Sequence, residues 1–101
     1  MYRIYVEFKA FSGKREAYIK KMNEGGYLSA IRGEEGCLLY DFYYAEKDAD
    51  ELLLVEVWES KAHQEAHMKT PHMAEVMELN KNYIESTRLG EFNLVEEKKD
   101  K

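Results

Sequence analysis

Apolar and polar residues alternate at the start of the chain, over Tyr2–Lys9. This period of two is typical of a β-strand with one apolar face. Two later segments, Cys37–Tyr44 and Leu52–Trp58, are rich in aliphatic and aromatic residues and flank an acidic turn. They predict an antiparallel hairpin, and Arg88–Val95 is predicted as the last strand.

Helical spacing replaces this alternation between Ser12 and Arg32. Apolar residues there fall on one side of a helix, and most lysine and arginine side chains fall on the other. Ser12 is the predicted N-cap, because its hydroxyl can accept a hydrogen bond from the first turn. Gly25 and Gly26 predict a kink or break, since each glycine costs about 1 kcal/mol relative to alanine inside a helix.

Further helices are predicted before the last strand. Ser60 is expected to cap a short helix, and Thr70 caps the next one with Pro71 at its first position, where a missing N–H does no harm. Helical spacing gives this next helix an inner face with a single polar residue, Asn80. The residues predicted on that face are Met73, Val76, Met77, Asn80, Tyr83 and Ile84.

The order of predicted elements is strand, helix, strand, strand, helices and strand. This order indicates a ferredoxin-like (split βαβ) α+β fold, with a four-stranded antiparallel sheet and helices on one face. The other face carries too many apolar side chains to lie in water, so a twofold homodimer is predicted to cover it. We expect one folded domain over residues 1–95 and a disordered charged tail over residues 96–101.

Composition narrows the classes of partner. The 101 residues include 15 basic and 20 acidic side chains, and the net charge of −5 argues against nucleic acid, whose phosphates require a basic surface. No apolar run approaches the roughly 20 residues needed to span a bilayer, so no membrane partner is expected. One cysteine and the lack of a signal-peptide pattern predict a cytoplasmic protein.

The segments EEGCLLYDF and EVWESKAHQEAHMKTPHM resemble the antibiotic biosynthesis monooxygenase family, particularly its quinol monooxygenase-like branch. The resemblance extends from Tyr2 to about Leu94 and implies a dimeric α+β barrel. The family's fold hosts several activities, including cofactor-free oxygenation, haem degradation and isomerisation. Haem-degrading relatives carry Asn, Trp and His where this sequence has Glu7, His67 and Met77, so haem degradation is disfavoured and no cofactor is expected.

Oxidation of a phenol or hydroquinone without a cofactor requires a base of near-neutral pKa, a hydrogen-bond donor for the anion, and apolar walls. His67 is the candidate catalytic base, on a helix whose Ala62 and Ala66 allow close packing against the sheet. The alternative for His67 is a packed structural histidine. Similar family members place an aromatic residue against the ligand at Trp58, which is therefore a candidate substrate-binding wall or else a core residue.

Other polar residues are candidate substrate contacts. Tyr40 is one of several tyrosines able to donate a hydrogen bond, Asn80 is the polar exception on its helix face, and His63 lies one turn before His67. Histidines at i and i+4 can bind a metal together. The sequence offers no third ligand of fitting spacing except His72, beyond a helix break, so no metal site is predicted.

Two carboxylates are unexplained by the strand pattern. Glu56 lies within an apolar strand, and a buried carboxylate must be paired or neutral. Arg3 or Arg88, on other predicted strands, could pair with it, and a contact between subunits or a role as catalytic acid is also open. Asp41 raises the same question. Cys37 has no basic neighbour in sequence, which predicts a buried, unreactive thiol.

The function predicted from these residues is a cofactor-independent monooxygenase, an oxidoreductase that oxidises a small quinol-type aromatic molecule with dioxygen. One alternative is an isomerase or related enzyme acting on a small metabolite, which requires basic side chains in the pocket. Arg3 and Arg88 are the residues on predicted strands that could supply them. Another is a non-catalytic ligand-binding or stress-response dimer. A pocket filled by tyrosine and methionine side chains would favour that last alternative.

Overall fold

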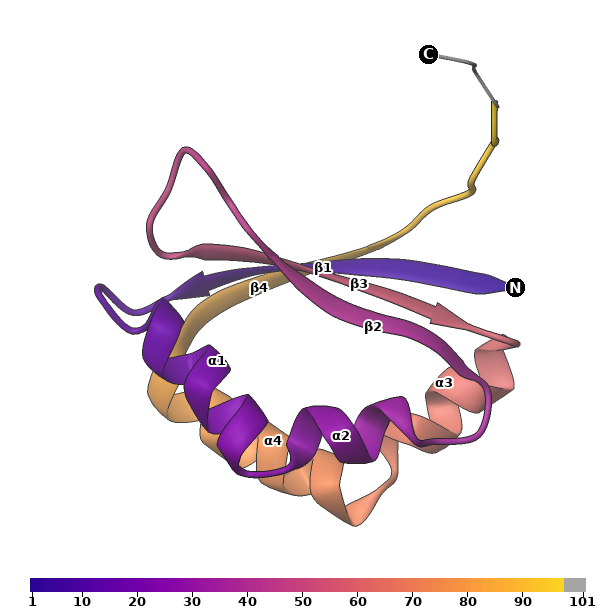
Figure 1. Ribbon diagram of the computed structural model, residues 1–101, viewed down its shortest axis with the longest axis horizontal. Helices are drawn as coiled ribbons and strands as arrows, with labels where there is room; N and C mark the ends of the chain where they lie inside the picture. Colours follow the sequence, from indigo (N-terminus) through magenta and orange to yellow (C-terminus); the bar gives the residue numbers. More distant parts are fainter. Residues whose placement is uncertain (98–101) are drawn as a thin grey trace.

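The computed structural model describes residues 1–97, which form one antiparallel sheet with helices packed on one of its faces (Figure 1). The strand order is β2-β3-β1-β4, which confirms the predicted split βαβ, ferredoxin-like arrangement. The strands are β1 (Tyr2–Ala10), β2 (Cys37–Tyr44), β3 (Glu51–Trp58) and β4 (Ile84–Glu91). The helices are α1 (Arg15–Glu24), α2 (Tyr27–Arg32), α3 (Lys61–Met68) and α4 (Pro71–Tyr83).

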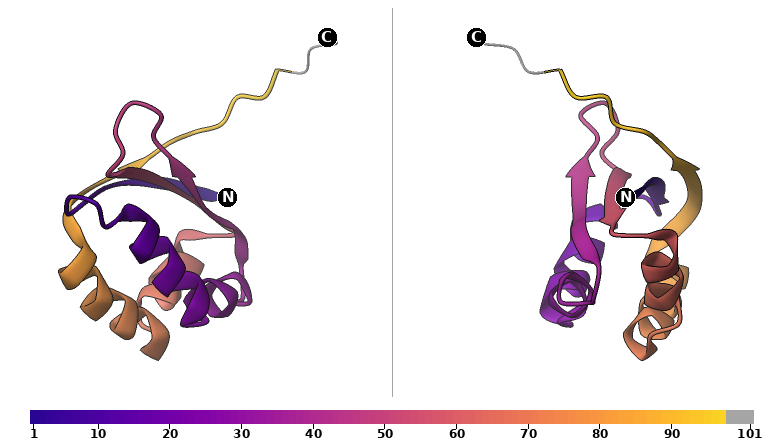
Figure 2. Two further views of the ribbon diagram at one scale, coloured as in Figure 1. Left: turned by 60° about the vertical axis from the view of Figure 1, so that its left-hand side comes forward. Right: turned by 90° about the vertical axis from the view of Figure 1, so that its right-hand side faces the viewer.

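The alternation of β1 is reproduced in its burial. Ile4, Val6, Phe8 and Ala10 are buried under the helices, and the residues between them lie on the outer face, the sheet face opposite the helices. Strand β3 repeats this pattern with every second residue buried. Figure 2 shows that the helices all lie to one side of the sheet, so the core is a single layer between them.

The predicted helix break is confirmed at Gly25 and Gly26. Helix α1 ends before this pair. Gly26 adopts a left-handed φ of 76°, and α2 begins at the next residue. The predicted N-cap is wrong, because the structure caps α1 at Lys14 instead of Ser12. Ser12 lies inside a turn in which the Lys14 N–H donates to the Phe11 carbonyl, so the helix begins after this turn.

The predicted caps of the later helices are confirmed. The Ser60 side chain accepts a hydrogen bond from the His63 backbone at the start of α3, and Thr70 accepts one from the Met73 backbone at the start of α4. Pro71 occupies the first turn of α4. Met77 is 50% exposed, so its predicted place on the inner face is wrong. The buried row runs through Met73 and Val76, which leaves Met77 on the solvent side.

The last strand was predicted too late in the sequence. Strand β4 begins at Ile84, where the backbone is extended immediately after the end of α4. Ile84 lies opposite Ala10, so the first residue of β4 already pairs with β1. The start of this strand is difficult to predict from the sequence, because most side chains of β4 are exposed and show no apolar alternation.

Strand β2 contains an irregularity that simple alternation does not predict. Alternation places Cys37 on the same face as Leu39, but the pairing of β2 with β3 shifts between these two residues. Cys37 therefore lies opposite Trp58, whose buried side chain is on the helix side. The extra residue is Leu38, as expected for a β-bulge near a strand end.

The chain after β4 continues without regular secondary structure through Glu97. The predicted tail covers residues 96–101, and residues 98–101 lie outside the described part of the structure. Within residues 1–97, no helix is both long and apolar enough to span a membrane.

Candidate functional site

The candidate base His67 lies on the side of α3 that faces the core, and its side chain is only 1% exposed. Its Nδ1 atom is 2.9 Å from Oε2 and 3.1 Å from Oε1 of Glu34. Glu34 comes from the loop between α2 and β2, and its own side chain is 12% exposed. The imidazole is therefore held by a carboxylate that approaches it from a different part of the chain.

The same carboxylate also binds His72. The Nε2 atom of His72, in the first turn of α4, lies 2.7 Å from Oε2 of Glu34. One carboxylate thus joins the loop, α3 and α4. An ionised carboxylate only accepts hydrogen bonds, so His67 Nδ1–H and His72 Nε2–H are the donors. The pairing identifies Glu34 as a site residue that sequence reasoning missed.

The loop that carries Glu34 depends on Gly36. This glycine has a φ of +81°, a left-handed conformation that side chains rarely adopt. A Cβ at this position would lie 2.4 Å from the His63 ring. Gly36 therefore allows the loop to turn tightly against α3, which brings Glu34 close to His67.

The second ring nitrogen of His67 has no partner. With the proton on Nδ1, Nε2 carries a lone pair, and this buried atom accepts no hydrogen bond from the residues that the structure describes. An unsatisfied buried polar atom costs about 1–3 kcal/mol. A hydroxyl group of a bound molecule would supply the missing donor.

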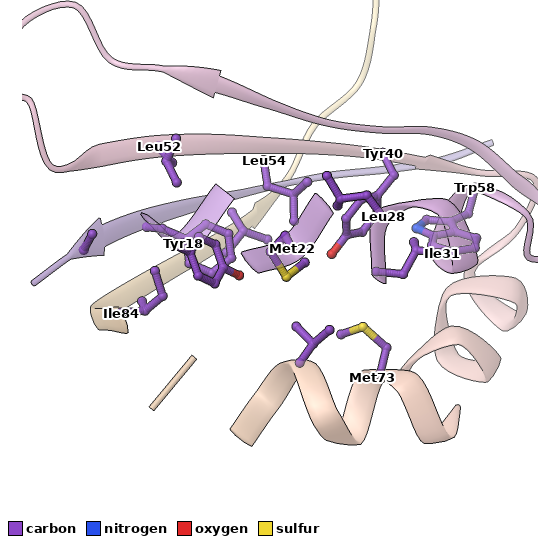
Figure 3. Close-up of a cluster of buried hydrophobic side chains, with 14 residues drawn as sticks. Tyr18, Met22, Leu28, Ile31, Tyr40, Leu52, Leu54, Trp58, Met73 and Ile84 are labelled. Atoms are coloured by element: carbon purple, nitrogen blue, oxygen red, sulfur yellow. The ribbon is translucent and has the colours of Figure 1, made fainter. Parts of the chain in front are cut away.

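Aromatic rings surround this imidazole. The ring of Trp58 lies 4.7 Å from the His67 ring at an interplanar angle of 35°, and the Tyr40 ring lies 5.7 Å away in an edge-on orientation. Both aromatic residues are buried. The predicted wall residue and the predicted base are therefore direct neighbours, at the end of the core where Figure 3 labels Trp58.

Glu56 completes this group on the sheet. Its side chain is buried, and its Oε1 accepts a hydrogen bond of 3.0 Å from Trp58 Nε1. Tyr40 lies directly across from it on β2. Burial raises the pKa of Glu56 to about 7, so a large fraction of this carboxyl group keeps its proton at neutral pH. Burial likewise raises the pKa of Tyr40 well above its ordinary value.

The predicted arginine partners of Glu56 are wrong. Arg88 pairs with Glu7, with 2.9 Å between Arg88 Nη2 and Glu7 Oε2. Arg3 alternates with the buried Ile4 and therefore lies on the outer face. Asp41 is explained more simply, because it is a half-exposed residue whose Oδ1 lies 3.4 Å from Arg32 Nη2 and accepts the Phe42 N–H.

Asn80 lies apart from this group, and His63 lies one turn before His67 on α3 at a more exposed position. The Asn80 side chain hydrogen-bonds Tyr18 and partly offsets the rise that burial causes in the Tyr18 pKa. Its buried Oδ1 atom has no partner among the described residues. Figure 3 places Tyr18 at the opposite end of the core from Trp58. The His63 side chain is 29% exposed, with its Nδ1 2.7 Å from Ser60 Oγ.

A surface hollow of about 380 Å³ opens beside α3, on the outer side of His67. We name it the α3 hollow. It contains side chains from the loop, α3 and the turn before α4, and the residues that line it are Glu34, Glu35, Ala62, His63, Ala66, His67 and Thr70. Glu34 and His67 therefore both border this hollow.

Cys37 has the properties of an unreactive thiol. It is half-buried, and burial raises its pKa, with Glu34 and Glu56 adding to the effect. A thiol with a raised pKa is a weak nucleophile at neutral pH.

Comparison with known proteins connects this arrangement to a family. Among solved structures, the chain is similar to PA3566 from Pseudomonas aeruginosa, with a TM-score of 0.81, 21% identity and 94% coverage of each chain. It is also similar to Rv0793 from Mycobacterium tuberculosis, with a TM-score of 0.79, 20% identity and coverage of 95% and 96%. At these identities, the likeness shows the fold alone.

A structure named antibiotic biosynthesis monooxygenase has a TM-score of 0.80, with 20% identity and coverage of 95% of this chain and all of the other. An uncharacterized protein of Synechocystis is 35% identical over 52 residues, or 52% of this chain, and the match spans 35% of that relative. The family profile named antibiotic biosynthesis monooxygenase matches residues 1–79. The chain therefore belongs to the antibiotic biosynthesis monooxygenase family.

Proposed function

We propose that this protein is a cofactor-independent monooxygenase that oxidises a small quinol-type aromatic molecule with dioxygen. The observation that carries the proposal is the hydrogen bonding of the two ring nitrogens of His67. Its Nδ1 is bound to Glu34, whereas its buried Nε2 has no partner and lies among aromatic residues. An imidazole oriented in this way is ready to take a proton from a substrate hydroxyl.

In this mechanism, His67 Nε2 accepts the hydroxyl proton of the substrate. Glu34 accepts the hydrogen bond from Nδ1–H and stabilises the imidazolium that results. The substrate anion transfers one electron to dioxygen, and the two radicals combine into a peroxide. Loss of water then leaves an oxygenated product. For a hydroquinone, the balance is one hydroquinone and one dioxygen to one hydroxyquinone and one water.

The neighbouring residues supply the other requirements. Trp58 provides a planar wall beside the imidazole, and Tyr40 presents a hydroxyl that stays protonated because burial raises its pKa. Glu56 holds a proton near neutral pH, which suits it to protonate the peroxide before water is lost. Low exposure of all three side chains excludes water from the radical pair.

A substrate ring must displace side chains to reach His67. Figure 3 shows Met22, Met73, Tyr18 and Tyr40 in the space between sheet and helices. Met22 and Met73 are the most adaptable of these, because an unbranched thioether changes conformation at small energetic cost. We therefore propose that the substrate takes the place of methionine side chains.

The test is oxygen consumption by purified protein from which metal and flavin have been removed, with a panel of hydroquinones as substrates. We expect uptake by the unaltered protein and a decrease of about 10²–10⁴-fold for His67→Gln, because general bases contribute that much. Glu35→Gln is the matched control, since Glu35 is 94% exposed at its side chain. Uptake that is absent, or unchanged in His67→Gln, would overturn the proposal.

A second candidate function is a non-catalytic ligand-binding dimer. The filled space between sheet and helices favours it, because tyrosine and methionine side chains occupy the position of a substrate. Hydroquinones that quench Trp58 fluorescence without oxygen uptake would distinguish ligand binding from catalysis. An isomerase acting on a phosphorylated metabolite has less support, since neither Arg3 nor Arg88 lies on the helix side of the sheet.

The proposed assembly is a twofold homodimer that joins the outer faces of two sheets. Large apolar side chains remain exposed there or at the β2 edge, including Leu39 at 38% and Tyr43 at 49%. On the neighbouring strand β3, Val57 lies opposite Leu39 and Leu53 lies opposite Tyr43, and both are only partly buried, as is Val55 between them. Exposed apolar side chains on one sheet face favour pairing with a second copy.

A further inference from the structure

Three potential metal ligands meet where the loop before β2, α3 and α4 come together. They are a carboxylate oxygen of Glu34, Nδ1 of His67 and Nε2 of His72, and all lie within 4.8 Å of one another. From the sequence, His72 beyond a helix break was the one possible third ligand for the histidine pair of α3, and no metal site was predicted. The structure adds Glu34 from a distant loop.

We propose that Glu34, His67 and His72 form a binding site for a divalent ion of the first transition row. Two imidazoles and one carboxylate are the donor set that zinc and iron(II) commonly bind in proteins. Oxygen-only sites suit magnesium or calcium instead, and no thiolate belongs to this cluster. The chemical class follows from these donors alone.

Two of the three distances between ligand atoms are close to those around an ion of this size. Ligand atoms bound at about 2.1 Å, at tetrahedral or right angles, lie about 3.0–3.5 Å from one another. Glu34 Oε2 is already 2.9 Å from His67 Nδ1 and 2.7 Å from His72 Nε2. The three atoms all lie within 4.8 Å of one another, so a rearrangement of the carboxylate and the two imidazoles admits the ion, which replaces the two imidazole protons as the group that Glu34 binds.

The site is preorganised and open on one side. The turn between α3 and α4 is held by Thr70, whose hydroxyl donates to the His67 carbonyl and accepts the Met73 N–H. Glu34 and His67 line the α3 hollow, and His72 is 25% exposed at its side chain. Solvent can thus deliver the ion and fill its remaining coordination positions with water.

The surrounding charges favour a cation overall. Glu35 and Glu59 each approach His63 within 3.8 Å, so this end of the molecule carries further carboxylates beside Glu34. The first turn of α4 opposes them, because a helix N-terminus carries partial positive charge. We therefore expect binding in the micromolar range and not the tightest affinities of structural zinc sites.

This inference goes beyond the proposed function, with which it shares His67. An ion on Nδ1 leaves the imidazole proton on Nε2, so the ion-bound form is a resting form of the proposed oxygenase. Ion binding is measured without substrate. Its failure therefore leaves the oxygenase proposal standing, and lack of oxygen uptake leaves the ion site standing.

The experiment is titration of the metal-free full chain with Co²⁺, followed by its visible absorption, and with Zn²⁺, followed by calorimetry. We expect one ion per chain. Glu34→Gln and His72→Gln should each weaken binding about tenfold or more, because each removes or weakens one ligand. Of two comparison variants, His63→Gln should bind as the unaltered chain does, and Glu35→Gln, which removes a neighbouring charge but no ligand, should weaken binding less than either ligand variant.

His63→Gln separates this site from a simple pair of histidines one turn apart on α3. Loss of binding in that variant, with binding retained in His72→Gln, would overturn the assignment. Binding that is absent at millimolar Co²⁺, or unchanged in Glu34→Gln and His72→Gln, would also overturn it. Circular dichroism checks the fold of each variant, and His72→Gln, at a partly exposed position, remains informative where Glu34→Gln does not fold.

Discussion

Glu34 is a single carboxylate that satisfies two imidazole donors, at distances of 2.9 Å and 2.7 Å. Such charge-assisted hydrogen bonds contribute about 1.5–3 kcal/mol each at buried positions. The carboxylate is nearly buried, so its bonds are poorly replaced by water. Glu34 therefore connects three segments of the chain, the loop before β2, α3 and α4, through one side chain.

We expect Glu34→Gln to lower the free energy of unfolding by about 1–3 kcal/mol, because a neutral amide oxygen replaces a carboxylate that accepts from both rings. Urea unfolding at pH 7 measures the change. Glu35→Gln, one position along the same loop, should change the free energy by less than about 0.5 kcal/mol, as surface substitutions usually do. Equal effects of the two substitutions would contradict the role assigned to Glu34.

Glu56 makes the stability depend on pH. Its pKa rises from 4.5 to about 7 on folding, so the folded chain binds more protons than the unfolded chain between these values. This contribution to stability is fully present below pH 4.5 and is lost as pH rises through about 7. Glu56→Gln removes the titration and keeps the shape of the side chain.

The difference in unfolding free energy between the unaltered protein and Glu56→Gln should therefore shift by up to about 3 kcal/mol between pH 5 and pH 8, in favour of the variant at high pH. Urea unfolding of both proteins at several pH values gives this difference. A difference that is independent of pH would show that Glu56 is ionised in the folded state.

At the scale of elements, the loop of residues 33–36 and α3 fit together through Gly36 and His63. An added Cβ at Gly36 meets the His63 ring at 2.4 Å, whereas at Gly13 nothing lies within 4 Å. Both glycines have positive φ values, of 81° and 75°. The two positions thus share the same backbone strain and differ in steric contact.

Gly13→Ala should cost about 1–2 kcal/mol of stability from the left-handed backbone alone. Gly36→Ala should cost about 1–3 kcal/mol more, because overpacking adds to this strain. Adding His63→Ala to Gly36→Ala should recover part of the additional loss. Thermal unfolding of the four proteins tests the idea, and an equal cost at both glycines would rule out the contact.

At the scale of the whole molecule, the sheet has two unequal faces. Helices cover one face, and the outer face presents aliphatic and aromatic side chains of β2 and β3. The central strand β3 carries Val55 on this face, opposite Tyr5 of β1. A second copy of the chain would remove this surface from water.

Val55→Lys should weaken self-association by about tenfold or more, since a buried interface charge without a partner is unfavourable. Sedimentation over a range of concentrations measures the change. Met77→Lys places the same charge on the solvent side of α4, where Met77 is 50% exposed, and should leave association unchanged. A monomeric unaltered chain, or equal effects of both variants, would contradict a dimer through the outer face.

The sequence alone determined the order of the helices and strands and several of the places where they begin or end. Alternation along β1, the break at Gly25 and Gly26, and the caps Ser60 and Thr70 all depend on neighbouring residues. Such signals are readable because backbone conformation and capping are local. His67 and Trp58 were also recognised from the sequence, through Ala62 and Ala66 on the helix of His67 and through the family resemblance at Trp58.

Only the tertiary structure decided what these residues touch. Glu34 is 33 positions from His67 in sequence and lies in a loop whose path follows from a positive φ at Gly36. The partner of Glu56 proved to be Trp58 on its own strand, not an arginine. Contacts of this kind depend on how helices and loops pack on the sheet, and no local pattern encodes the distance between two side chains that are remote in sequence.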